Sequence, residues 1–213
     1  MGTKNATHLF EFPGPAHNSE PWWSALFSML LLHLATFPSD GRIPLRRFVT
    51  RETEWSYTPA GNLEIPAGLL YEQVLAEPRL SQTFFRLSDW DSSFEALRPD
   101  VAVINPTAQF VVLIENKTVG ADLGTKASQL TTSLKLIVHL LKHSWKAESL
   151  LLISAGYTNN RDLRAIRDGK VRLILWEDVL RLMNKIERFR QAFPGVDLSE
   201  YYNVKLSGKG WQG

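Results

Sequence analysis

Cysteine is absent from this chain, and neither sign of charge is in large excess. Without cysteine there are no disulfide bonds and no thiolate ligands, so any metal ion must be held by oxygen or histidine donors. The 213 residues include 24 lysines and arginines against 22 aspartates and glutamates, a formal net charge of +2. This near balance is compatible with nucleic-acid binding but does not argue for it, because a local basic patch matters more than the net sum.

Hydrophobic residues make up 44% of the sequence and charged residues 22%, which excludes a largely disordered chain. A chain of this length can form one domain with a substantial core. We expect an N-terminal arm over residues 1–19, a single domain over residues 20–206 and a flexible, glycine-rich tail over residues 207–213. The first residues lack the cationic and apolar regions of a signal peptide, and we expect a cytoplasmic protein.

The longest apolar run starts at Glu20 and reads EPWWSALFSMLLLHLATF. Ser19 suits an N-cap and Pro21 a first turn, so we predict a helix over residues 20–37. A membrane span is the alternative. The run is short for a bilayer, however, and two serines and a histidine interrupt it, so a buried core helix is favoured.

Residues 98–118 read RPDVAVINPTAQFVVLIENKT and place three ionisable side chains, Asp100, Glu115 and Lys117, within two apolar runs. Both runs are rich in valine and isoleucine, and the NPTA segment between them has turn chemistry, so we predict a β-hairpin. Because side chains alternate along a strand, Glu115 and Lys117 share one face and Asn116 points to the other.

The loop of this hairpin decides whether Asp100 joins Glu115 on the same face. With an even loop, such as residues 105–108, Asp100 falls opposite Leu113 and diagonally adjacent to Glu115. An odd loop would send Asp100 to the opposite face, because a slip of one residue turns every side chain over.

Two carboxylates and an ammonium on one apolar face are costly unless they are paired or coordinate an ion. Aspartate and glutamate oxygens suit Mg²⁺, which keeps several waters and shares its remaining positions with phosphate oxygens. Lys117 would then lie beside the metal-bound water or the phosphate. A purely structural hairpin with a salt bridge between Asp100 and Lys117 is the alternative, and it leaves Glu115 unexplained.

The PD pair at residues 99–100 followed by the ENK triplet at residues 115–117 resembles the PD-(D/E)XK nuclease superfamily with an IENK-type core. This resemblance implies an α/β protein with a restriction-endonuclease-like αβββαβ core, in which helices flank a mixed central sheet. It covers roughly residues 20–176 by topology, but only three short patches by motif.

The resemblance implies a Mg²⁺-dependent nuclease, with DNA endonuclease activity in repair or in defence against foreign DNA. Asp100, Glu115 and the backbone carbonyl of Asn116 would hold Mg²⁺, for which Mn²⁺ can substitute, and Lys117 would orient or deprotonate the attacking water. The alternative is a nuclease-like fold that no longer cuts and binds nucleic acid or a protein partner. No separate recognition domain is visible, so specificity would come from a partner protein, a homodimer or the arginine-bearing loops.

The resemblance adds two more residues to the predicted site. Many members carry a glutamate on the first helix that reaches the metal, and Glu20 matches it, although an acid near a helix N-terminus is also favourable by itself. Gln129 matches a glutamine of the helix that we predict over residues 125–143. The family pattern has an aromatic residue four positions later, where this sequence has Ser133. An ordinary surface glutamine is the alternative for Gln129.

His139 and His143 lie four residues apart on that same helix, a spacing that can bind metal. The glutamate of a HExxH motif is missing, and a helix C-terminus favours histidine in any case. We therefore expect no metal role for this pair.

Two arginine-rich segments could contact phosphates, although solvated arginines are the alternative for both. The nucleic-acid-binding candidates within them are Arg46, Arg47, Arg161 and Arg164. Elsewhere the pattern predicts strands within residues 48–57, 83–87, 149–155 and 171–176, and helices within residues 67–75, 160–168 and 177–193.

Overall fold

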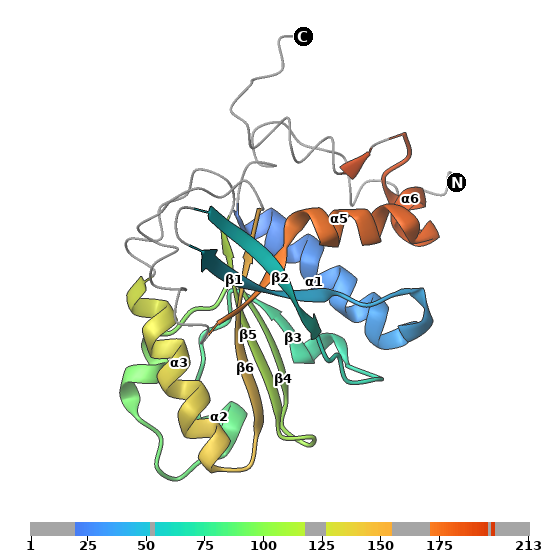
Figure 1. The fold of residues 1–213 in the computed structure, drawn as a ribbon. Helices are drawn as coiled ribbons and strands as arrows, with labels where there is room; N and C mark the ends of the chain where they lie inside the picture. Colours follow the sequence, from blue (N-terminus) through green and yellow to red (C-terminus); the bar gives the residue numbers. More distant parts are fainter. Residues whose placement is uncertain (1–19, 52–53, 118–126, 155–170, 196, 199–213) are drawn as a thin grey trace, which may run out of the picture.

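The computed structural model describes residues 20–51, 54–117, 127–154, 171–195 and 197–198 (Figure 1). Its strands are β1 (Pro44–Arg51), β2 (Glu54–Asn62), β3 (Val74–Ala76), β4 (Val101–Asn105), β5 (Phe110–Lys117), β6 (Lys146–Ile153) and β7 (Arg172–Leu175). The helices are α1 (Glu20–Thr36), α2 (Gln82–Phe85), α3 (Ala127–Lys142), α5 (Trp176–Lys185) and α6 (Glu187–Ala192). Short 3₁₀ turns are η3 (Pro38–Asp40), η4 (Tyr71–Gln73) and η5 (Ser92–Ala96).

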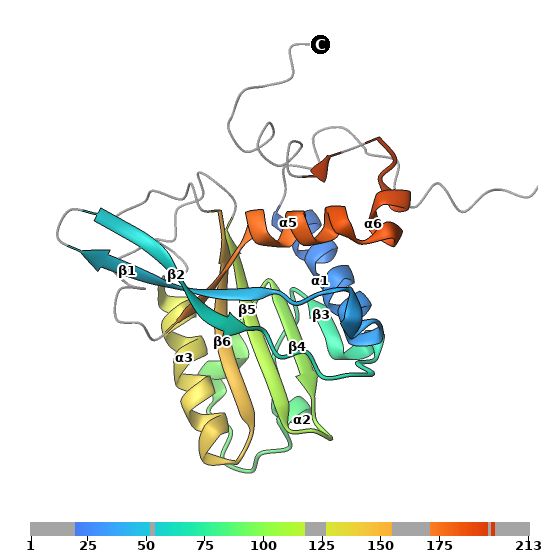
Figure 2. The same ribbon diagram turned by 45° about the vertical axis from the view of Figure 1, so that its right-hand side comes forward.

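The strands form one sheet in the order β2-β1-β7-β6-β5-β4-β3. The neighbours β5, β6 and β7 are parallel, whereas the pairs β3–β4, β4–β5, β1–β2 and β1–β7 are antiparallel. Helix α3 lies on one side of the sheet and α1 on the other (Figures 1 and 2). The prediction of an α/β protein with a mixed sheet flanked by helices is therefore confirmed.

Every residue of β5 is buried, which explains its nearly continuous apolar sequence. Val112 and Ile114 pack with Phe27 on the side of the sheet that α1 covers, the α1 side. Val111 and Leu113 pack with residues of α3 on the opposite side, the α3 side. A charged residue of β5 therefore lies between packed layers on both faces of the sheet.

Helix α1 is a core helix, as predicted. Trp23, Phe27, Leu30 and Leu31 are completely buried, and Trp23 meets Trp176 of α5 edge to face with ring centroids 5.3 Å apart. Within the described ranges, no helix combines the length and apolar character needed to cross a bilayer.

The prediction of a strand over residues 83–87 is wrong, since this segment contains the short helix α2. Threonine and two phenylalanines favoured a strand locally, but Phe85 is buried and stacks on Trp90 with ring centroids 5.3 Å apart. Tertiary aromatic packing thus overrides the local propensity. Arg86 then ends the helix in the left-handed region, at φ 53°.

The prediction of a helix within residues 67–75 is also wrong, since this segment holds only the turn η4 and the start of β3. Other elements follow the predictions with shifted boundaries. The strand predicted within residues 48–57 is the hairpin β1–β2. The helix predicted over residues 177–193 is divided into α5 and α6, because Ile186 has extended backbone angles, φ −83° and ψ 117°. The predicted helix over residues 160–168, the arm and the tail lie outside the described residues.

Candidate functional site

The register of β4 and β5 decides the geometry of the three ionisable residues. Asn105 pairs with Phe110 and Val101 with Ile114, so the loop spans residues 106–109 and is even, as predicted. Continuing this register by one residue places Asp100 opposite Glu115. The predicted position opposite Leu113 is therefore wrong by two residues.

The turn itself explains this shift. Asn105 still belongs to β4, and its side-chain oxygen accepts a hydrogen bond from the backbone N–H of Ala108 at 3.0 Å. Gln109 adopts a positive φ of 47°, which completes the reversal at the last position of the loop. Because the period of a strand is two residues, a shift by two leaves each side chain on its predicted face.

Asp100, Glu115 and Lys117 belong by alternation to the α3 side of the sheet. Ala102 and Leu113, which pair with each other, pack on that side. Glu115 pairs with Leu151 of β6 and Lys117 with Ile153, and both β6 residues belong to a buried cluster that includes Leu130 of α3. Glu115 and Lys117 therefore share this face, as predicted, and continuing the alternation of β4 by one residue places Asp100 on it as well.

All three side chains are strongly buried, with exposed fractions of 6% for Asp100, 2% for Glu115 and 2% for Lys117. Asp100 Oδ2 accepts a hydrogen bond of 2.7 Å from the backbone N–H of Asn116, which fixes the carboxylate beside β5. Burial of such groups is costly unless polar or ionic partners offset it, so their presence together on one face is a strong chemical signal.

Asn116 points to the α1 side, as predicted, and is completely buried there. Its Nδ2 donates to Ser24 Oγ at 3.1 Å, and its Oδ1 accepts from the indole N–H of Trp176 at 3.0 Å. Ser28 Oγ in turn donates to the carbonyl of Ser24 at 2.9 Å. Sequence reasoning assigned only the backbone carbonyl of Asn116 and missed this side-chain network, which holds Asn116 between α1 and α5.

Gln129 lies in the first turn of α3, the helix that covers the α3 side. Its Oε1 atom is buried and accepts no hydrogen bond from any part of the chain that the structure describes. Ser133, one turn later, is 1% exposed, so a small buried residue stands where the family pattern has an aromatic ring. Glu20 begins α1, but its side chain lies outside the described part of the chain.

The four arginines predicted to contact nucleic acid differ in their placement. Arg46 donates two hydrogen bonds, of 3.0 and 2.8 Å, to Asp178 Oδ2 and is engaged in this ion pair. Arg47 is exposed and lines a groove of about 540 Å³ near the start of β5, at the end of the strand opposite to Lys117. Arg161 and Arg164 lie outside the described residues.

Further polar groups missed from the sequence follow the carboxyl ends of the parallel strands. Ser154 comes directly after β6 and donates to Glu177 Oε1 at 2.6 Å, and Glu177 comes shortly after β7. Parallel α/β sheets bind ligands at this edge, and Lys117 ends the neighbouring strand β5. Ser154 and Glu177 are therefore candidates for the surroundings of the site.

The pKa of the Tyr57 phenol tests the position of Glu177 at this edge of the sheet. Burial, and to a lesser degree the negative charge of Glu177, raises the pKa of Tyr57 to about 12 from the usual 10.0. The stability contributed by the neutral phenol is therefore complete below pH 10 and is lost as pH rises towards 12. We expect Glu177→Gln to lower this pKa while leaving it above the usual value, because burial is the larger cause.

The measurement is the phenolate absorbance of the protein, corrected by subtracting the same titration of Tyr57→Phe, since the chain has five tyrosines. An ionisation midpoint near the usual value in the otherwise native protein would contradict the buried position of Tyr57.

Comparison of the chain with protein-family models, with curated proteins and with solved structures gives no match.

Proposed function

We propose that this chain is a Mg²⁺-dependent nuclease of the PD-(D/E)XK type that hydrolyses phosphodiester bonds, with DNA as its substrate. The observation that carries the proposal is the burial of Asp100, Glu115 and Lys117 on one face of the sheet, at the carboxyl end of β5. Groups with no chemical role are seldom maintained in so costly an arrangement.

The order of elements supports the same proposal. A helix, three antiparallel strands, a helix and a parallel strand occur in the order α1, β3, β4, β5, α3 and β6, with the hairpin β1–β2 inserted after α1 and the short helix α2 between β3 and β4. This order agrees with the αβββαβ core that the motif resemblance implies, with Asp100 directly before the second of those three strands and Glu115 on the third.

The donor set fits a hard divalent cation. The carboxylates of Asp100 and Glu115 and the carbonyl of Asn116 would hold Mg²⁺, which supplies Lewis acidity toward water and phosphoryl oxygens when bound. Lys117 would orient the attacking water and stabilise the negative charge that develops on the phosphoryl oxygens. The backbone hydrogen bond from Asn116 holds the carboxylate of Asp100 in position for this role.

A direct test incubates the purified protein with plasmid, linear duplex and single-stranded DNA, in Mg²⁺ and in excess chelator. We expect cleavage only with the metal, and Mn²⁺ should replace Mg²⁺. Cleavage of circular plasmid would identify an endonuclease. Absence of cleavage with all three substrates in both metals would contradict the proposed activity.

A nuclease-like module that binds nucleic acid or a protein partner without cutting is the second candidate. It is favoured by the very low exposure of the three ionisable side chains, at most 6%. A nuclease must bring a phosphodiester of a polymer into contact with these side chains, and the observed burial leaves little room for that contact. This alternative predicts binding of DNA without a metal requirement and without strand breaks.

Metal binding can be measured separately from cleavage. We expect Mg²⁺ at ten times its Kd to stabilise the protein by about 1.4 kcal/mol, which raises the melting temperature by a few degrees. Glu115→Gln should lose this shift, because the amide cannot supply the negative charge that holds the ion. An equal shift in wild type and Glu115→Gln would contradict the assignment of Glu115 as a metal ligand.

A further inference from the structure

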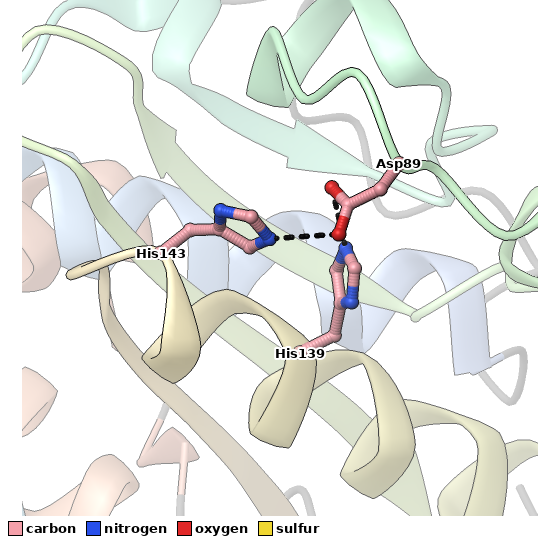
Figure 3. A group of neighbouring side chains, drawn as sticks. All are labelled: Asp89, His139 and His143. Atoms are coloured by element: carbon pink, nitrogen blue, oxygen red, sulfur yellow. Dashed lines mark hydrogen bonds and ion pairs between the residues drawn. The ribbon is translucent and has the colours of Figure 1, made fainter.

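We propose that Asp89, His139 and His143 form a binding site for Zn²⁺ or a similar transition-metal ion, separate from the site around Glu115. His139 lies in the last turn of α3, His143 directly follows that helix, and Asp89 comes from the loop between α2 and η5 (Figure 3). Among the described residues, this is the group of three or more potential ligands whose donor atoms lie close enough to share an ion, all within 4.8 Å of one another.

The separations of the donor atoms match a tetrahedral ion. His143 Nε2 lies 3.1 Å from Asp89 Oδ2, and His139 Nε2 lies 3.6 Å from Asp89 Oδ1. An ion with bonds of about 2.0–2.1 Å places neighbouring tetrahedral ligands about 3.4 Å apart. Both imidazoles turn the same nitrogen, Nε2, toward the carboxylate of Asp89, each toward a different oxygen (Figure 3), at separations near those of two ligands on one ion.

The Nε2 atom of His139 gives a further reason to place a metal ion at this site. This atom is buried and makes no hydrogen bond with any residue that the structure describes. A buried polar atom without a hydrogen bond is costly, and a metal ion bound by Nε2 would remove that cost. The partial burial of this ring beside Phe94, with centroids 5.6 Å apart, also fixes its orientation.

Asp89 supplies the oxygen donor of the group. Its side chain is 57% exposed, so its carboxylate is accessible to an ion from solvent, and carboxylate oxygen is a common ligand of Zn²⁺. Asp89 adds, from a distant part of the chain, a third donor that the spacing of the two histidines alone does not provide.

The donor types indicate the class of ion. Two imidazoles and one carboxylate suit Zn²⁺ and its neighbours, whereas Mg²⁺ prefers oxygen donors alone. Three protein ligands leave a fourth position for water. Such an ion would also connect the loop before η5 to the end of α3, next to the contact of Phe85 with Trp145, whose ring centroids are 5.3 Å apart.

The test uses the full chain without an affinity tag, because oligohistidine tags bind Zn²⁺ themselves. Calorimetric titration with ZnCl₂ should show one saturable site, and excess Mg²⁺ should not displace the ion. His139→Ala, His143→Ala and Asp89→Ala should each weaken binding, the histidine variants by about 100-fold, since changes outside the ligand shell alone cost 10–100-fold.

His33→Ala is the matched control. This histidine also pairs with one aspartate, Asp40, at 2.7 Å, but it has no third ligand within the described chain. The control variant should bind Zn²⁺ as the wild type does. The same titration in excess Mg²⁺, which would occupy the site around Glu115, separates this site from the nuclease proposal.

Nuclear magnetic resonance provides a measurement that needs no variant to fold. Addition of Zn²⁺ should shift the imidazole signals of His139 and His143 together, at one equivalent, and leave those of His33 in place. The proposal is overturned if no saturable binding occurs, if the double variant His139→Ala/His143→Ala binds as tightly as the wild type, or if the shifts of these two rings do not saturate together.

Discussion

Asp100→Asn and Lys117→Met are each expected to remove Mg²⁺-dependent DNA cleavage while preserving the fold. Asparagine keeps an oxygen that can accept the N–H of Asn116 but lacks the charge needed to hold a divalent ion. Methionine keeps the length and apolar character of the Lys117 stem without its ammonium group. We expect Lys117→Met to lower the cleavage rate by about 10²–10⁴-fold, and Asp100→Asn by at least as much.

Matched controls lie on the neighbouring strand β6. Glu148 and Lys146 precede Leu150 by an even number of residues and so share its face, which is the α1 side and not the face of Glu115. Burial raises the pKa of Glu148 against the opposing hydrogen bond and charge of Arg172, so a neutral glutamine should be tolerated there. Glu148→Gln and Lys146→Met should cut DNA at the wild-type rate.

Melting temperature and circular dichroism should show that both site variants are folded, so that lost cleavage reports on chemistry. Full cleavage by purified Asp100→Asn or Lys117→Met would refute the assignment of the nuclease site to this face. Loss of cleavage in the two control variants as well would show that any charge change in the sheet is harmful, and that the site residues have no special role.

The arrangement of the site was predictable because it depends on local periodicity. Asp100, Glu115 and Lys117 are assigned to a face by alternation along two strands and by the parity of one short loop. The observed pairing differs from the predicted one by two residues, because the side-chain turn at Asn105 keeps this residue in β4, but the faces of the side chains are unaffected. Because side chains alternate with a period of two residues, an error of two in the exact pairing does not change the predicted face.

Contacts between distant segments could not be predicted in the same way. Asp89 bonds His143 across 54 positions, Trp176 bonds Asn116 across 60, and Asn116 bonds Ser24 across 92. No spacing within a short motif encodes such contacts, because they depend on how the helices pack against the sheet. The same reason explains the wrong strand at residues 83–87, where the burial of Phe85 decided the conformation.

Trp176→Ala is expected to destabilise the protein more than any of the site substitutions, by about 3–5 kcal/mol. The indole is completely buried and contacts Trp23 and Phe27 edge to face, with centroids 5.3 and 6.1 Å away. Since a domain of this kind is stable by only about 5–15 kcal/mol, this loss is a large fraction of the total. Chemical denaturation followed by circular dichroism measures it.

Trp176→Phe separates packing from the hydrogen bond to Asn116. Phenylalanine retains an aromatic ring but removes the indole N–H that donates to Asn116 Oδ1, which should cost about 1–3 kcal/mol in addition to any loss of packing. Trp90→Phe is the control, because the Trp90 indole nitrogen is buried and donates no hydrogen bond within the described residues. Its replacement should cost less.

A double-mutant cycle of Trp176→Phe with Asn116→Leu then isolates the interaction. If the hydrogen bond contributes to stability, the double variant should lose less than the sum of the two single variants, because the donor and the acceptor are removed together. Additive losses in the free energy of unfolding would mean that the hydrogen bond does not contribute to stability. A coupling energy accompanied by slower cleavage in Trp176→Phe would show that the α1-side network also holds the backbone carbonyl of Asn116 in place, linking the two faces of β5.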